Sequence, residues 1–257
     1  MTLWTSADAG EWATVWARYR DVVASVQKEN LVELDEWIQT TLPVVLHERD
    51  PKPFITQSEL VKLMEWKLKK GKWRPSLMKY IENLSAPAVK KASEKALTGL
   101  KNGGPLKSAI EALCELKGVG PATASVVLAA YDNNVPFMGD EALEAIAHII
   151  GARKYTLGHY LNFATQLAEK AKWLNEQQTK SEDSGDEEGA STWSSQRVQL
   201  CLYAAAQDTN GDGQKKKSKA VSPKPKATKS KAATDPDGED ESEGTKSSRP
   251  MRKRRKA

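Results

Sequence analysis

The chain has 257 residues, of which 39% are hydrophobic and 28% are charged, and its formal net charge is +5 at pH 7. The charge is unevenly spread. Fifteen of the 39 lysines and arginines, but only eight of the 34 acidic residues, follow Gln207, which leaves 24 basic and 26 acidic residues before it. The basic excess therefore belongs to the C-terminal segment, and the preceding length allows one large domain or two small ones.

Two cysteines and three scattered histidines are too few for a zinc site or an iron–sulfur cluster. Cys114 and Cys201 each lie in an apolar helical pattern, which is typical of small buried side chains in a reducing compartment. No apolar run approaches the roughly 20 residues that cross a bilayer, and the N-terminal residues lack the pattern of a signal peptide. We therefore expect a soluble intracellular monomer with no cofactor, no metal and no membrane contact.

Apolar residues at steps of three and four predict helices along most of the first 207 residues. Thr56 and Glu59 have the spacing of a capping box, and Pro105 has the position of a first-turn proline. The expected helices cover about residues 12–26, 31–38, 58–70, 76–84, 87–97, 106–116, 122–131, 141–150, 157–174 and 193–206. Neither an alternating strand pattern nor an internal repeat is found. The sequence predicts an all-α fold.

Two segments have too few apolar residues to pack into a core. Residues 175–191, NEQQTKSEDSGDEEGAS, are acidic and predict a flexible insertion. Residues 208–257 are rich in Lys, Ser, Pro and Gly, so we expect a helical domain over residues 1–207 and a disordered basic tail. The tail ends in RPMRKRRKA, a basic cluster typical of nuclear import signals, which predicts a nuclear protein.

The stretch LKGVGPATASVV, which begins at Leu116, predicts a tight turn between two helices. Gly118 and Gly120 can adopt positive φ and let another backbone approach closely, and Pro121 starts the next helix. Backbone N–H groups and the positive end of that helix would then bind an anion, which on a nucleic acid is a phosphate. The alternative is an ordinary helix–helix turn that uses two glycines and binds nothing.

The longer pattern LxGVGxxTA resembles the helix-hairpin-helix motif of the HhH-GPD superfamily of DNA glycosylases. In that family an apolar helix follows the hairpin, then a turn containing Gly and Pro, then a catalytic aspartate at the start of the next helix. Here the turn is residues 135–139, VPFMG, and the aspartate is Asp140, at the family's distance from Thr123. More narrowly, LKGVGPATAS followed by PFM-x-DEA resembles a eukaryotic branch of glycosylase-like proteins.

The resemblance implies a bilobed helical fold in which the helix-hairpin-helix spans about residues 106–131. A base flipped out of the duplex would enter a cleft between the lobes. Asp140 would stabilise the positive charge that develops on the sugar as the base departs, and would orient the attacking water. The resemblance also implies DNA contacts by Lys117, Gly118, Val119, Gly120 and Thr123.

Asp140 has a second interpretation that needs no chemistry. An aspartate directly before EALEAIAHII has the position of a helix N-cap, whose side chain accepts hydrogen bonds from the first-turn N–H groups.

Two positions depart from the family pattern. Family members that also cut the strand have a lysine directly before the Thr-Ala pair, where this chain has Ala122, so the resemblance implies no lyase activity. The family's Thr-His-x-x-Arg after the aspartate is replaced here by residues 141–145, EALEA, whose two carboxylates would repel phosphate. The iron–sulfur cysteines of one branch are also missing.

The segment EWKLKKGKWRP, residues 65–75, combines basic side chains with two tryptophans. The default interpretation is a solvated helix end whose lysines complement the helix dipole. The functional interpretation is a second phosphate contact by Lys70, Lys72 and Arg74, with Trp66 or Trp73 able to stack on a base and at least one of them in the core.

Three functions remain open from the sequence. The first is a nuclear, monofunctional DNA N-glycosylase that removes a damaged or mismatched base in base excision repair. The second is a catalytically inactive helix-hairpin-helix adaptor that binds double-stranded DNA together with repair or chromatin proteins. The third is a protein-interaction module, which the nearly neutral charge of residues 1–207 permits.

Overall fold

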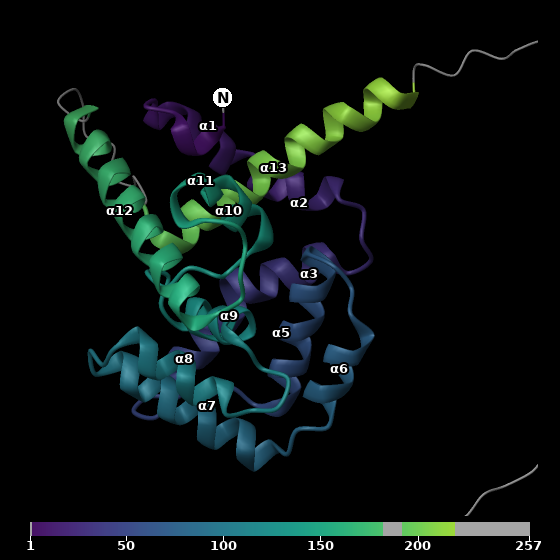
Figure 1. Ribbon diagram of the computed structural model, residues 1–257. Coiled ribbons are helices and arrows are strands. Elements are labelled where there is room, and N and C mark those ends of the chain that lie inside the picture. Colours follow the sequence, from purple (N-terminus) through teal and green to yellow (C-terminus); the bar gives the residue numbers. More distant parts are fainter. Residues whose placement is uncertain (1, 182–191, 219–257) are drawn as a thin grey trace, which may run out of the picture. The chain divides into compact units, whose positions relative to one another are not determined.

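The computed structural model describes residues 2–181 and 192–218 (Figure 1). These residues form helices and no strands, which confirms the predicted all-α class. Two short elements are the 3₁₀ helix η1 (Leu3–Thr5) and the π-helix η2 (Trp37–Thr41). The α-helices are α1 (Ala9–Ala17), α2 (Tyr19–Ser25), α3 (Leu31–Glu36), α4 (Leu42–Glu48), α5 (Gln57–Lys70), α6 (Pro75–Glu82), α7 (Ala86–Lys101), α8 (Leu106–Cys114), α9 (Pro121–Tyr131), α10 (Asp140–Ala145), α11 (Ala147–Ile150), α12 (Leu157–Ser181) and α13 (Ser195–Ser218).

Some helices differ from those expected. The helix predicted over residues 12–26 is divided at Arg18, and the one over 141–150 is divided at Ile146, where φ is −112°. The helical path predicted over residues 31–38 continues further, since Pro43 lies in the first turn of α4, directly after the π-helical turn η2. A proline near a helix start costs little, because its missing N–H would have no partner there.

The helix start expected from Thr56 and Glu59 forms as predicted. The Thr56 side chain accepts from the Glu59 N–H, and the Glu59 carboxylate accepts from the Thr56 N–H at 2.8 Å. The Arg49 guanidinium forms a bidentate contact with the same carboxylate, with N···O distances of 2.7 and 2.8 Å. This cluster fixes the N-terminal end of α5, whose other end carries the basic segment.

The core is a continuous set of buried side chains that joins the first helices to the last. α13 packs against α1, α2, α10 and α12, and its Val198, Cys201 and Leu202 are buried, as the periodicity predicts for a helix that returns to the core. In Figure 1, α13 (yellow-green) lies beside the purple helices of the N-terminus. The last helix therefore shares a core with the first, although nearly the whole described chain lies between them.

Two helices extend beyond their predicted ends, into the segments predicted as the acidic insertion and the basic tail. α12 extends to Ser181, so the start of the predicted acidic insertion is helical, and the Asn175 side chain exchanges two hydrogen bonds with the backbone of Trp193. α13 continues past Gln207 to Ser218. Residues 182–191 and 219–257, with the rest of the predicted insertion and most of the predicted tail, lie outside the described residues. None of the described helices is long and apolar enough to span a membrane.

Candidate active site

The hairpin joins α8 to α9 through Gly118, whose φ is +87°. A Cβ atom on Gly118 would lie 2.6 Å from the Cβ of Tyr80, so both the backbone conformation and the packing require glycine. The positive φ expected at Gly120 is wrong: its φ is −110° and its ψ is −179°, which any residue can adopt. A Cβ atom on Gly120 would meet nothing within 4 Å, so no part of the protein itself requires glycine there.

The hairpin presents unpaired backbone donors. The N–H groups of Gly118, Gly120 and Ala122 have no acceptor among the described residues, whereas the Gly120 carbonyl accepts from both Thr123 and Ala124 at 2.9 Å. The three donors belong to residues that line one pocket, at the N-terminal end of α9. N–H groups at a helix N-terminus, together with the helix dipole, favour an anion.

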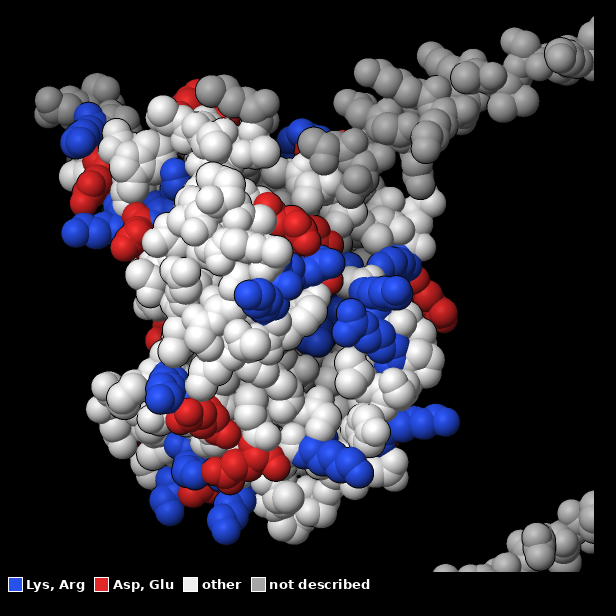
Figure 2. Space-filling model, in the orientation of Figure 1, with Lys and Arg blue, Asp and Glu red and all other residues white. Residues whose placement is uncertain are grey.

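This pocket gathers most of the site residues expected from the sequence. Its cavity volume is about 240 Å³, below the range of about 300–1,000 Å³ for drug-sized ligands, which leaves room for a small group. The expected site residues that line it are Lys70, Lys72, Arg74, Gly118, Gly120, Thr123 and Asp140. Figure 2 shows lysine and arginine side chains gathered over the end of α5 and the start of α6, with acidic side chains beside them.

Two predicted hairpin contacts lie outside this lining. The Val119 side chain is buried in the core, so only its backbone is available to DNA. The Lys117 ammonium lies 5.2 Å from the centre of the Tyr80 ring, on the exposed side of the hairpin. Neither position conflicts with a phosphate contact, but neither residue contributes a side chain to the pocket.

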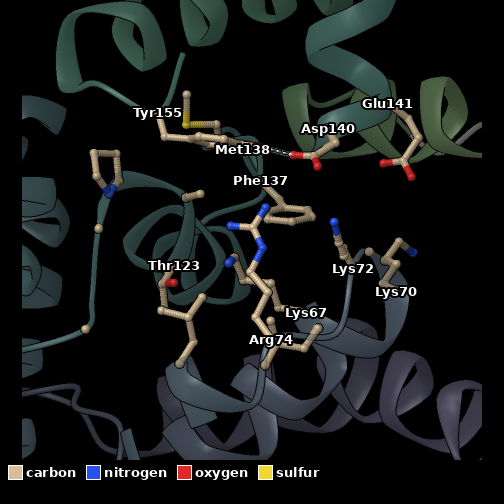
Figure 3. A pocket seen from close by; sticks show the side chains of 17 residues that line it. Lys67, Lys70, Lys72, Arg74, Thr123, Phe137, Met138, Asp140, Glu141 and Tyr155 are labelled. Atoms are coloured by element: carbon tan, nitrogen blue, oxygen red, sulfur yellow. Dashed lines mark hydrogen bonds between the residues drawn. The ribbon is translucent and has the colours of Figure 1, made fainter. Parts of the chain in front are cut away.

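The pocket has a cationic wall and an acidic wall (Figure 3). Lys67, Lys72 and Arg74 come from the end of α5 and the loop to α6, and Asp140 and Glu141 come from the start of α10. The floor is apolar and includes Leu68, Leu77, Phe137 and Met138. A flat apolar group with a charged or polar rim fits such a lining.

Asp140 is the first residue of α10 and is not its N-cap. The N-cap is Gly139, whose carbonyl accepts from the Leu143 N–H at 3.0 Å, so the capping interpretation of Asp140 is wrong. The Asp140 carboxylate instead accepts from the Tyr155 hydroxyl at 2.6 Å and pairs with Arg153 at 3.4 Å. Its side chain is 35% exposed, and Figure 3 shows it directed to the pocket.

The turn before Asp140 is fixed from three directions. A Cβ atom on Gly139 would lie 2.6 Å from the Nε2 of Gln199, so a side chain there would force the Gln199 side chain to move. The hydrogen bonds that hold the turn are Phe137 N–H to Gln196 Oε1 at 2.8 Å, Met138 N–H to Ser125 Oγ at 2.9 Å and Tyr160 O–H to the Pro136 carbonyl at 3.1 Å. α9, α12 and α13 therefore together set the position of the carboxylate.

Burial raises the pKa of the Glu141 carboxyl above its ordinary value. The charge of Asp140 acts in the same direction, whereas Lys70 and Lys28 oppose it. Burial and the like-charged neighbour thus disfavour the ionised form of Glu141.

Lys70 is buried and is engaged in a contact within the protein. Its ammonium donates to Asp35 at 2.9 Å and to the Tyr19 hydroxyl at 2.5 Å, and the Trp66 indole N–H donates to the same carboxylate at 2.9 Å. The phosphate contact predicted for Lys70 does not fit this position, because moving its charge to DNA would leave Asp35 buried and unpaired. Trp66 belongs to the core, whereas Trp73 is 50% exposed.

Three residues in or beside the pocket were not predicted as site residues. Tyr155 and Arg153 hold Asp140, and they come from the loop before α12, for which no local motif gives a signal. Lys67 lines the pocket on the wall that faces Asp140. The sequence contained a signal for Lys67, since it is three residues before Lys70 and therefore on nearly the same side of α5.

No protein-family model, no curated protein and no solved structure matches the chain. Among the described residues, no group of three or more His, Cys, Asp or Glu side chains is placed to hold a metal ion. The function is therefore inferred from the residues of the pocket and from the resemblance of the hairpin.

Proposed function

We propose that the protein is a nuclear DNA N-glycosylase of the HhH-GPD type, with the bilobed helical fold of that family. It binds duplex DNA through the hairpin and removes a damaged or mismatched base in base excision repair. One observation carries the proposal: three N–H groups without an acceptor among the described residues and four cationic side chains line the same pocket as the Asp140 carboxylate.

The proposed binding step uses the backbone of the hairpin. The N–H groups of Gly118, Gly120 and Ala122 hold a phosphate, and the open space at Gly120 lets the DNA backbone approach. Lys72 and Arg74 are exposed and contact further phosphates. A base flipped from the stack then lies on the apolar floor formed around Phe137.

The proposed chemical step uses Asp140. As the base leaves, positive charge develops on the sugar, and a fixed carboxylate on the facing wall stabilises that charge. Tyr155 and Arg153 hold the carboxylate in place. Burial, followed by the hydrogen bond to Asp140, raises the pKa of the Tyr155 hydroxyl, so Tyr155 keeps its proton and remains a donor. Ala122 offers no amine, so water attacks the sugar in this step.

The test is base release from a panel of duplexes that carry uracil, alkylated bases or oxidised bases. We expect the wild-type protein to release at least one of them, and Asp140→Asn to lower the rate by about 100-fold or more. Asp21→Asn is the matched control, since Asp21 is an exposed aspartate of α2, remote from the pocket lining. Equal rates in wild type and Asp140→Asn would refute the role of this carboxylate.

A second function has an observation in its favour. Asp140 is engaged by Tyr155 and Arg153, and Glu144 pairs with the same arginine at 3.4 Å, in the region where the family has Thr-His-x-x-Arg. This arrangement suits an inactive helix-hairpin-helix adaptor that binds DNA for repair or chromatin proteins. DNA binding that depends on the hairpin, with no base released from any duplex, would favour the adaptor.

A further inference from the structure

Lys67 differs from the other lysines at the end of α5 because it has no partner. Lys69 pairs with Glu65 at 2.9 Å, and Lys70 pairs with Asp35 at 2.9 Å. Lys67 is partly buried, yet it forms no ion pair or hydrogen bond with any described side chain. A cation that is partly removed from water without a partner is unfavourable, and such groups are typical of sites where the amine itself is used.

The surroundings of Lys67 favour its neutral amine. Burial lowers the pKa of Lys67, the positive charge of Arg74 lowers it further, and Asp140 opposes the two. A lysine that is desolvated and lies next to a second cation is an activated nucleophile, because more of it is unprotonated near neutral pH. Figure 3 shows Lys67 and Arg74 on the wall across the pocket from Asp140.

We propose that Lys67 is a nucleophile that attacks the aldehyde of an abasic nucleotide held in this pocket, which gives the protein a strand-cleaving activity of its own. The inference rests on the proposed function, since it needs a DNA strand in the pocket. The substrate class is the ring-opened abasic deoxyribose, which is the product that base removal would leave. The sequence predicts no lyase activity, because Ala122 occupies the position of the family's lysine, and the inference departs from that prediction because Lys67 lines the same pocket from α5.

The chemistry needs no cofactor or oxidant. The Lys67 nitrogen forms a bond to C1′ of the aldehyde, and the carbonyl oxygen takes up a proton. Loss of water then gives a protonated Schiff base. A carboxylate of the facing wall removes a proton from C2′, and the electron pair moves to expel the 3′ phosphate, which breaks the strand. Water finally hydrolyses the Schiff base and restores the amine.

The simpler use of Lys67 is as a phosphate contact, in which only its charge matters. Lys67→Arg separates the two, because arginine keeps the positive charge but its guanidinium does not form a Schiff base at neutral pH. A charge role predicts that Lys67→Arg behaves as wild type. A nucleophilic role predicts that DNA is still bound while the covalent chemistry is lost.

The experiment incubates the full chain with an end-labelled duplex that carries one preformed abasic site, with and without borohydride. We expect strand cleavage without borohydride and a covalent adduct with it, and peptide mass spectrometry should place the adduct on Lys67. Lys67→Arg should lower adduct yield and cleavage at least about tenfold, with DNA affinity changed less than about threefold. Lys69→Arg is the matched control and should react as wild type, because Lys69 is paired with Glu65.

Circular dichroism and thermal melting compare Lys67→Arg and a second variant, Lys67→Gln, with the wild type. A loss of chemistry in a variant that melts as the wild type does is not a folding defect. An adduct on any other lysine, or an unchanged yield in Lys67→Arg, would overturn the inference. Base release without an adduct on Lys67 would overturn it as well and leave the glycosylase proposal standing. An adduct on Lys67 without base release from any lesion would support the inference and refute the glycosylase.

Discussion

The hydroxyl of Tyr155 donates a 2.6 Å hydrogen bond to the carboxylate of Asp140 and so links the loop before α12 to the first residue of α10. Tyr155 is 41% exposed and contributes little to the core, so its main interaction is the hydrogen bond to Asp140. It is a positioning residue in the proposed reaction.

We therefore expect Tyr155→Phe to lower kcat for base release about tenfold and to leave the KM for DNA nearly unchanged, because the substitution loosens the carboxylate and not the DNA contacts. Thermal melting should shift little. Tyr131→Phe is the control, since Tyr131 stacks on His47 away from the pocket. An equal loss in both variants would mean that the effect is not specific to Asp140.

The two glycines of the hairpin should respond differently to substitution. Gly120→Val should weaken binding to duplex DNA of any sequence and leave the melting temperature nearly unchanged, because its backbone angles suit valine and its Cβ position is open. Gly99→Val in the exposed part of α7 is the control, and it should bind as wild type. Unchanged binding in Gly120→Val would remove the hairpin from the DNA interface.

Gly118→Ala should instead destabilise the fold, by about 1–3 kcal/mol or more, because it combines positive φ with a clash on Tyr80. Chemical denaturation measures the loss. A Gly118→Ala protein as stable as wild type would show that the hairpin relaxes to accept a side chain.

The buried pair of Lys70 and Asp35 should matter for stability and not for DNA affinity. Lys70→Met leaves the Asp35 charge buried without a partner, which should cost about 3–5 kcal/mol in the free energy of unfolding. Asp35→Leu combined with Lys70→Met should recover much of that loss. Lys72→Met is the contrasting variant, because Lys72 is exposed, and it should weaken DNA binding with little effect on stability. A folded Lys70→Met protein with strongly reduced DNA affinity would contradict this assignment.

Glu59 should make stability depend on pH in the acid range. Burial alone would raise the pKa of the Glu59 carboxyl, but hydrogen bonds from Arg49 and Thr56 outweigh it and hold the pKa below its ordinary value. A lowered folded-state pKa stabilises the fold above the unfolded-state pKa of about 4.3, and this stabilisation is lost as pH falls through the folded-state value. Glu59→Gln should thus cost about 1–3 kcal/mol at pH 7 and much less near pH 3. A cost that is independent of pH would assign the effect to packing.

The helices could be predicted from the sequence, because an apolar stripe at helical spacing reflects burial directly. Thr56 and Glu59 show the same for a helix start, since all partners of a capping box lie within one turn. The breaks at Arg18 and Ile146 could not be predicted, because the apolar pattern continues through both and tertiary packing decides where the helix axis turns.

Part of the site could also be predicted from the sequence, because some of its residues lie close together along the chain. The hairpin and Asp140 belong to a contiguous stretch, whereas the partners of Asp140 come from another loop. Within the basic segment the sequence could not distinguish Lys70 from Lys67. The difference depends on Asp35, which lies in α3 and binds Lys70, whereas Lys67 forms no ion pair with a described side chain and lines the pocket.

The hydrogen bond from the Phe137 N–H reaches Gln196, which lies 59 residues later in the chain. During synthesis on a ribosome, the hairpin and Asp140 leave the exit tunnel well before α13 exists. A nascent chain released before that point would carry the hairpin, but the turn before Asp140 would lack its hydrogen bond to α13. In the proposed function, full activity would therefore require that translation has passed α13.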